Sequence, residues 1–262
     1  AHIQALGTQI IGLSSSAASA LNSMQIQALT TSQVDALSTQ TLAALTSDAV
    51  IGFSSADVSV FDSAAIQALG SKFSYLTDAA LLGVQSANAS GLSASQIQSL
   101  SSGQVARLTS SALIGLNESA IVGFESQDIG TFDSTDIQAL GARINSLSSS
   151  AVAALNSTQI NALTTDQTAD LSTAFLSHLS ATAVAGFDAT DIDRFDAQQI
   201  QALGPQISGL SNTAIQGLSL SNVKDMNATQ VSALSSTQFL HLSSAALLGL
   251  SSAALAGVST AD

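Results

Sequence analysis

An eight-residue repeat runs through almost all of the 262-residue chain and limits its possible folds more than any other feature. Aligned on their closing apolar residue, units such as TTSQVDAL, NSTQINAL and SSAALLGL share the pattern Ser/Thr-x-x-Gln/Ala/Asp-Ile/Val/Leu-x-Ala/Gly-Leu/Phe. About 33 such octads follow one another. A single short repeat cannot bury its apolar face alone, so such units stack on their neighbours. The repeat therefore predicts a solenoid.

Each octad is predicted to form its own short helix. The large apolar residues at positions 5 and 8 are three apart, which is a helical spacing. A Ser, Thr or Asn before the helix and a Gln three residues later, as in Asn156 and Gln159, form the capping-box pattern of a helix start. One continuous helix would turn its Leu stripe by ~80° per octad, so the helix must break in every unit.

The predicted architecture is an all-α solenoid of very short helices, with two or three octads per coil. Positions 5 and 8 should form the core, so Leu163 is expected to be buried on all sides. Small residues at position 7 let neighbouring backbones approach closely, and large residues there should lie at an edge, as at Tyr75, Arg107, His178 and His241. The arrangement predicts an elongated rod of about 100 to 150 Å, one continuous domain over residues 1–262, as a segment of a longer repeat array.

Four steps of seven residues interrupt the octads, and each follows the sequence IQALG. They recur at intervals of 63, 71 and 63 residues, so a longer repeat is superposed on the octad. Pro205 follows the last IQALG, where a first helical turn accepts proline. Three pairs of Phe precede the later steps: Phe53 with Phe61, Phe124 with Phe132, and Phe187 with Phe195. These rings are predicted to widen the core, with an exposed adhesive aromatic ladder as the alternative.

Composition excludes several classes of protein. Five Lys and Arg against 18 Asp and Glu give a net charge of -13, the wrong sign for a nucleic-acid partner. No apolar run approaches the ~18 residues of a membrane span, and the first residues lack the pattern of a signal peptide. We therefore expect a soluble chain without membrane insertion. The absence of Cys removes disulfides and thiolate metal sites.

The candidate chemistry is confined to acidic residues that recur at equivalent places of the long repeat. Carboxylates on adjacent helix starts could bind Ca²⁺, which takes oxygen ligands. The other interpretation is that each Asp replaces Ser or Gln in a helix cap, where the helix dipole favours an anion. The candidates are Asp57, Asp62, Asp128, Asp133, Asp136, Asp188, Asp191 and Asp196. No other cofactor is expected.

Catalysis is not predicted. A serine nucleophile needs a base within hydrogen-bond reach, and no G-x-S-x-G elbow or Ser-His-Asp order is present. His178 and His241 occupy equivalent positions of the long repeat, and we interpret them as edge residues rather than as a ligand ladder. We expect a chain that is not an enzyme.

The stretch QIQALTTSQVDALSTQTLAAL resembles the Ser/Thr/Ala/Gln/Leu-rich short-repeat regions of large secreted or surface adhesin-like (hemagglutinin-like) proteins of Gram-negative bacteria. The resemblance covers almost the whole chain and implies an extracellular or cell-surface location. Near-uniform repetition favours a spacer, an adhesin stalk or a filament segment that self-associates end to end or laterally. The alternative is a repeat scaffold that binds a peptide or glycan on one solenoid face.

Overall fold

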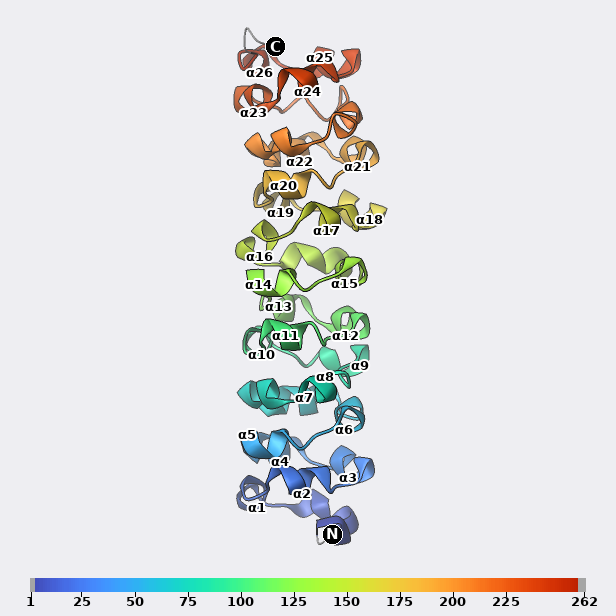
Figure 1. Cartoon of the computed structure of the whole chain (residues 1–262), viewed down its shortest axis with the longest axis vertical. Coiled ribbons are helices and arrows are strands. Elements are labelled where there is room, and N and C mark those ends of the chain that lie inside the picture. The colour runs from blue at the N-terminus through green and yellow to red at the C-terminus, as the bar shows by residue number, and fades with distance from the viewer. Residues whose placement is uncertain (1–2, 259–262) are drawn as a thin grey trace. The chain divides into compact units, whose positions relative to one another are not determined.

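Every regular element in residues 3–258, the part of the chain that the computed structural model describes, is a short helix, and these residues contain no strand. Within each of its two compact units the helices stack in successive layers (Figure 1). The chain divides into two compact units, Ala1–Thr131 and Phe132–Asp262. The predicted all-α solenoid of very short helices is confirmed, whereas the single continuous domain over residues 1–262 stays a prediction.

The first unit begins with 3₁₀ turns and continues as α-helices with one further 3₁₀ helix. Its elements are η1 (Ile3–Gly12), α1 (Ser15–Ser19), α2 (Ser23–Gln27), α3 (Thr31–Asp35), α4 (Thr39–Ala44), α5 (Ser47–Val50), α6 (Ser55–Ser59), α7 (Ser63–Leu69), η2 (Gly70–Tyr75), α8 (Asp78–Leu81), α9 (Ser86–Ala89), α10 (Ala94–Gln98), α11 (Ser102–Val105), α12 (Ser110–Gly115), α13 (Glu118–Ile121) and α14 (Ser126–Ile129).

The second unit repeats this arrangement. Its elements are α15 (Ser134–Leu140), η3 (Gly141–Ser146), α16 (Ser149–Ala153), α17 (Ser157–Asn161), α18 (Thr165–Ala169), α19 (Thr173–Ser177), α20 (Ala181–Val184), α21 (Ala189–Arg194), α22 (Ala197–Ala202), η4 (Gly204–Gly209), η5 (Ala214–Gly217), α23 (Ala228–Ala233), α24 (Ser236–Leu240), α25 (Ser244–Gly249) and α26 (Ser252–Leu255).

The caps explain where most helices begin. At α17, Oδ1 of Asn156 accepts the backbone N–H of Gln159 at 3.0 Å, and Oε1 of Gln159 accepts the backbone N–H of Asn156 at 3.0 Å. This reciprocal pair satisfies two amide groups that a helix start leaves unpaired. The prediction that an octad starts its own helix is thus confirmed at the capped units.

The seven-residue steps begin differently, without a polar cap. Helix α7 runs directly into η2 through Gly70, whose φ of 54° lies in the left-handed region that favours glycine. Gly7, Gly141 and Gly204 have the same conformation. Pro205 lies in the first turn of η4, as predicted. Each IQALG sequence therefore joins two helices at a sharp bend and dispenses with the capping residue.

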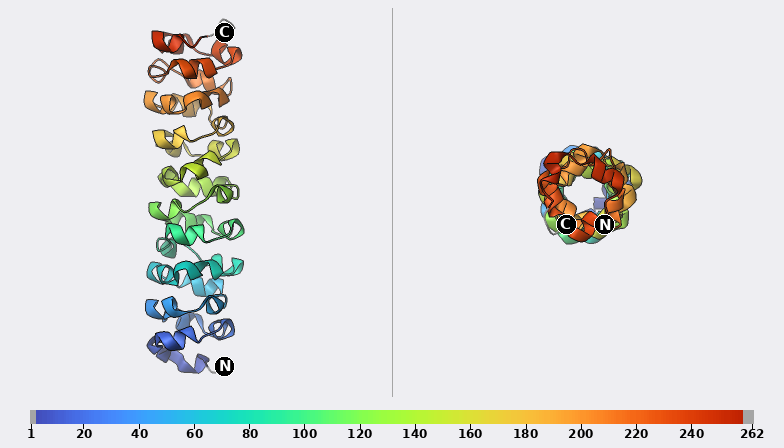
Figure 2. Two further views of the ribbon diagram at one scale, coloured as in Figure 1. Left: turned by 90° about the vertical axis from the view of Figure 1, so that its left-hand side faces the viewer. Right: turned by 90° about the horizontal axis from the view of Figure 1, so that it is seen from above.

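Helices three octads apart pack on one another, and this contact defines the coil (Figure 2). In the first unit α1 packs on α4, α2 on α5, and α3 on α6; in the second α17 packs on α20, α18 on α21, and α19 on α22. Residues stacked directly on one another are farther apart than three octads, since Gly186 lies against Ser157 and Gly217 against Ala189, 29 and 28 residues earlier. A coil therefore contains between three and four octads, more than the two or three predicted from the sequence. No helix is stable alone at this length, so these contacts must stabilise it.

The core follows the octad positions closely. Residues at positions 5 and 8, such as Ile160 and Leu155, are buried. A Cβ atom added to Gly186, at position 7, would overlap the carbonyl oxygen of Ser157 and lie 2.8 Å from Cβ of Ile160. Tyr75 and Arg107, which are large residues at position 7, are exposed, as predicted. Small residues at this position let one coil approach the next.

Leu163 is an exception, because the structure leaves it half-buried rather than buried on all sides as the sequence predicted. The octad that follows Leu163, and the helix that packs on that octad, depart from the consensus. Thr168 takes position 5 of the next octad, and α21, which packs on α18, carries the carboxylate of Asp191 at its start. The octad register therefore holds at Leu163, although the next octad has a polar residue at position 5.

The Phe rings belong to the core. Phe53 and Phe61 are buried with ring centroids 5.2 Å apart in a T-shaped contact, and Phe187 and Phe195 repeat this geometry at 5.2 Å. Phe124 and Phe132 are also buried. The alternative of an exposed adhesive aromatic ladder at these six residues is therefore wrong.

Candidate functional site

The acidic candidates of the first unit lie at helix starts. Asp57 is the third residue of α6, and its Oδ2 accepts the backbone N–H of Ser54 at 2.9 Å and the Ser54 hydroxyl at 2.7 Å. Asp62 caps α7 by accepting the N–H of Ala65 at 2.7 Å. Asp128 is the third residue of α14 and accepts the N–H of Glu125 at 2.9 Å. All three carboxylates are occupied by donors of their own helix.

The second unit repeats the arrangement with pairs of Asp. Asp133 caps α15 and Asp136 follows at its third position, where Oδ2 accepts the N–H of Asp133 at 3.2 Å. Asp188 and Asp191 stand in the same relation at α21, at 3.0 Å. Asp196 caps α22 by accepting the N–H of Gln199 at 2.8 Å. The capping interpretation of these Asp residues is confirmed.

The acidic residues do not gather around a common point. In residues 3–258, no three His, Asp or Glu side chains come close enough together to hold a metal ion. Calcium binding by the eight Asp residues stays a prediction. His178 and His241 are exposed, with Nδ1 of each 2.7 Å from the carbonyl oxygen four residues earlier. They are edge residues, as predicted from position 7.

Burial raises the pKa of Asp191 above its ordinary value, and the neighbouring charge of Asp188 adds to this effect, while the hydrogen bond from the Asp188 backbone opposes it. A carboxyl whose pKa is raised on folding destabilises the folded state when it ionises. Stability should therefore rise as the pH falls through the folded pKa, and be lower at neutral pH.

Asp191→Asn should stabilise the second unit by about 0.5 to 1.5 kcal/mol at neutral pH. The amide keeps an oxygen for the N–H of Asp188, removes the half-buried charge, and gains a donor, as Asn88 has at the third residue of α9. Denaturant melts at neutral and acidic pH measure the effect, which should shrink in acid. The exposed Asp193→Asn in the same helix is the matched control, and an equal gain there would contradict the argument.

A further role of the third helical residue was missed by the sequence analysis. Apart from Gln25, the Gln and Asn residues at this position accept the cap N–H with their oxygen and donate with their side-chain nitrogen to a carbonyl of the coil before, and Asn222 does the same at the equivalent place of an octad without a helix. These bonds, the coil links, are Gln33 to Gln4 and Gly7, Asn88 to Val58, Gln96 to Ile66, Gln104 to Ser74 and Leu76 in the first unit, and Gln159 to Phe132, Gln167 to Ile137 and Gly141, Gln199 to Ala169 and Leu171, Asn222 to Ile192, Gln230 to Ile200, and Gln238 to Ser208 and Leu210 in the second.

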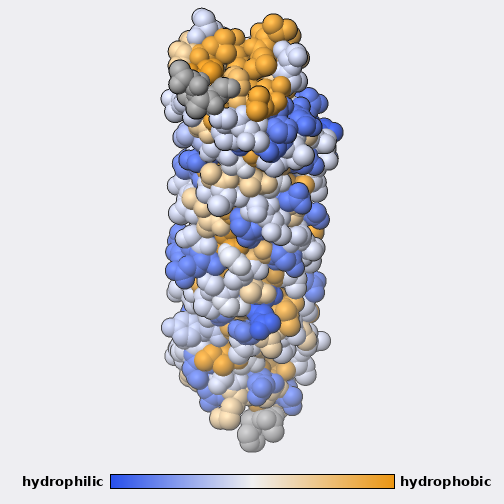
Figure 3. Space-filling model, turned by 45° about the horizontal axis from the view of Figure 1, so that its top comes forward, coloured by the Kyte–Doolittle hydropathy of each residue, from blue (hydrophilic) through white to orange (hydrophobic). Residues whose placement is uncertain are grey.

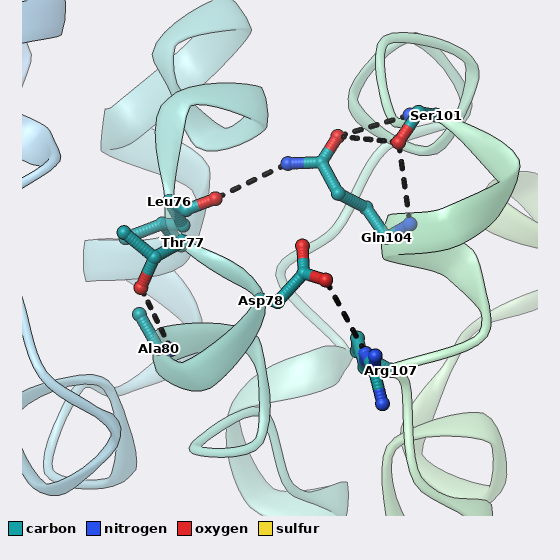
Figure 4. Close-up of polar contacts among 7 residues, drawn as sticks. All are labelled: Leu76, Thr77, Asp78, Ala80, Ser101, Gln104 and Arg107. Carbon is teal, nitrogen blue, oxygen red and sulfur yellow. Dashed lines mark hydrogen bonds and ion pairs between the residues drawn. The ribbon is translucent and has the colours of Figure 1, made fainter.

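Figure 4 shows one of these coil links in the first unit. Gln104 accepts the backbone N–H of Ser101 at 3.0 Å and donates from Nε2 to the carbonyl of Leu76 at 3.1 Å. Beside it, Arg107 contacts Asp78 at 3.3 Å, with both side chains more than half exposed. An exposed ion pair of this kind contributes little, whereas the hydrogen bonds from Gln104 to the carbonyls of Ser74 and Leu76 are partly buried. The coils are therefore joined mainly by amides and apolar contacts.

A signal for the coil link was present in the sequence. Both Glu and Gln can serve the capping box, yet among the 26 described α-helices the third residue is Gln or Asn in ten and Glu in none. Only an amide has both an acceptor for the cap and a donor for the next partner. The choice of Gln over Glu thus marks the contact between coils.

The comparisons with known proteins agree with a repeat. A family model of the ALTTAQ repeat matches residues 144–173, which lie in the second unit and include α17 and α18. A search of curated proteins finds no match to the chain. Within the described residues, no helix has the length and apolar character needed to cross a bilayer. The matched segment is thus a repeat region.

Proposed function

We propose that this chain is a non-catalytic structural element of an extracellular or cell-surface bacterial protein, acting as a spacer, an adhesin stalk or a self-assembling filament segment. The observation that carries the proposal is the coil link, because the polar side chains that recur in the octads are engaged in capping helices and joining coils. Stacking of this kind lets the length of each compact unit grow with its number of octads.

The near-uniform octad repeat argues against an enzyme. A catalytic site needs a unique arrangement of a nucleophile, a base and groups that orient them. Here the hydroxyls of residues such as Ser101 and Thr109 accept backbone N–H groups of their own helices, at 3.3 Å in both cases. The location outside the cell rests on the resemblance of the sequence to surface repeat regions.

Removing one long repeat tests the structural role. Deleting residues 141–203 joins Leu140 to Gly204 and recreates the IQALG sequence at the joint. Because repeat contacts are made between near neighbours, the shortened chain should fold with unchanged helicity per residue and a smaller hydrodynamic radius. The matched control deletes residues 141–199, which breaks the octad register. A chain that unfolds equally in both deletions would contradict the proposal.

The proposed location is tested on intact cells of the source organism. An antibody against the chain should label cells without permeabilisation, and an added protease should remove the label. Labelling that needs permeabilised cells would contradict a surface location, and it would leave the structural role to be judged by the deletion.

A second candidate, a scaffold that binds a peptide or glycan, is favoured by one observation. A shallow hollow of about 590 Å³ in the second unit is lined by Ser208, Leu210, Ser211, Asn212, Ala233, Ser235, Thr237 and Gln238. Hydroxyls and amides are suited to sugar hydroxyls. Binding on a glycan array that is lost in Asn212→Ala but retained in Asn145→Ala would support this candidate, and no binding to any glycan or peptide would eliminate it.

A further inference from the structure

Three octads at equivalent places of the long repeat carry an acid where the coil links have an amide. Asp57 on α6, Asp128 on α14 and Asp191 on α21 are each the third residue of their helix. Hydrophilic side chains are scattered over the face of the molecule that Figure 3 shows, so polarity alone marks no site there. Comparison of the three octads is more informative, because the one in the second unit departs from the two in the first.

The first departure lies in the coil on which each of these helices packs. Helix α6 packs on α3, α14 on α11, and α21 on α18. The residue 23 positions before each Asp is position 5 of the earlier octad, namely Val34, Val105 and Thr168. All three side chains are buried, but only Thr168 brings a hydroxyl group into this contact.

The Thr168 hydroxyl is buried without a partner. The residue is 1% exposed, and among residues 3–258 its Oγ1 is the one buried side-chain oxygen or nitrogen that makes no hydrogen bond. Leaving such an atom unpaired costs free energy. The hydroxyl lies beside Asp191, since burial raises the pKa of that carboxyl most and the nearby Thr168 hydroxyl lowers it. An unpaired oxygen is thus available next to a carboxylate.

The second departure lies in the capping residue. At α6 the cap is Ser54, whose hydroxyl donates to Asp57 at 2.7 Å. At α21 the cap is Asp188, whose Oδ1 accepts the N–H groups of Thr190 and Asp191 at 2.7 and 2.9 Å. The other oxygen of each carboxylate, Oδ2 of Asp188 and Oδ1 of Asp191, accepts no backbone N–H from the described residues. Two like charges are therefore held at one helix start, each with an oxygen left over.

The charges around this place favour a cation. Asp166 lies on α18, Asp170 follows that helix, and Asp193 lies on α21, and all three are exposed. Arg194 is the one basic residue in the two helices. The local potential is therefore negative, which raises the local concentration of cations.

We propose that the carboxylates of Asp188 and Asp191, together with the hydroxyl oxygen of Thr168, bind a hard divalent cation of the size of Ca²⁺ in the second unit. Ca²⁺ takes oxygen ligands, waters included, in a flexible geometry. The cation neutralises the two like charges at the start of α21 and gives the Thr168 oxygen a partner. Because water must supply the remaining ligands, we expect a weak site with a Kd of about 10⁻⁴ to 10⁻³ M.

Two variants each remove one ligand and keep the fold. Asp188→Asn removes a carboxylate, and Asn remains a good helix cap. Thr168→Val removes the hydroxyl and installs the residue of the two equivalent octads in the first unit. The matched control is Asp133→Asn, which makes the same change of charge at the cap of α15, where Asp133 and Asp136 form another acidic pair in the second unit.

Calcium titration of the whole chain, followed by calorimetry and by thermal melts, measures the binding. Wild type and Asp133→Asn should melt roughly 3 to 10 °C higher in about 10 mM Ca²⁺ than in a chelator. Each ligand variant should weaken calcium binding roughly tenfold or more. In the chelator Thr168→Val should melt above wild type, because it removes an unpaired buried hydroxyl. The gain in stability expected above for Asp191→Asn also applies in the chelator.

Three outcomes would overturn the proposal. If NaCl at equal ionic strength raises the melting temperature as much as CaCl₂ does, the ions only screen the net charge of -13. If Asp188→Asn and Thr168→Val bind calcium as wild type does, these residues are not its ligands. If Asp133→Asn loses the response as fully as Asp188→Asn, the acidic caps act without a specific site. The structural role proposed above does not depend on any of these results.

Discussion

Phe187→Ala should destabilise the second unit by about 3 to 5 kcal/mol. Phe187 is buried and its ring meets that of Phe195 with centroids 5.2 Å apart. Truncation removes the transfer free energy of the ring, leaves a cavity, and abolishes an aromatic contact worth about 0.5 to 1.5 kcal/mol. Denaturant melts followed by circular dichroism measure the loss.

Phe187→Leu is the matched control, because Leu closes most octads in this chain. It should cost about 1 kcal/mol, since it largely preserves the volume and the octad pattern. If Ala and Leu have the same small effect at residue 187, the Phe ring does not contribute to the core and the packing account of the long repeat fails.

Gln230→Glu should be strongly destabilising at neutral pH, by about 3 to 5 kcal/mol. The side chain of Gln230 is fully buried, accepts the N–H of Asn227 at 3.2 Å and donates to the carbonyl of Ile200 at 2.8 Å. A carboxylate at residue 230 still accepts the N–H of Asn227, but it places a buried negative charge against the carbonyl oxygen of Ile200. Since protonation restores a donor, the loss should shrink as the pH falls.

Two comparisons make this prediction specific for the coil link. Gln230→Ala should cost about 2 to 3 kcal/mol, because it removes both bonds without adding a charge. Gln25→Glu changes the same helical position in the first coil, where no earlier coil accepts the amide, and should be nearly neutral in a melt of the monomer. If Gln230→Glu is as mild as Gln25→Glu, the third helical residue acts only as a cap.

The local features of the fold could be predicted from the sequence because each depends on a few residues. The Asn156 and Gln159 pair predicts a helix start, the bulk at Tyr75 predicts an edge, and the position of Asp133 predicts a cap. All of these agree with the structure. Such features depend on spacing within one octad, which a sequence displays directly.

The features that the sequence analysis missed depend on contacts between coils. Leu163 is half-buried beside an octad that carries Thr168 at position 5, and the donor role of Gln159 is directed at Phe132, 27 residues earlier. An octad pattern does not specify which residues of neighbouring coils meet. The use of Gln rather than Glu at the third helical residue was the one feature within an octad that indicated the hydrogen bond to the neighbouring coil.

We expect the octads to stack as successive coils along the chain, and small-angle scattering measures the resulting length. About 33 octads at three to four per coil, with ~8 to 10 Å between packed helices, predict a radius of gyration of about 25 to 35 Å for a monomer. A compact globule of 262 residues would give ~18 Å. In a dilution series extrapolated to zero concentration, a value of about 25 to 35 Å supports stacked coils, and a value near ~18 Å contradicts them.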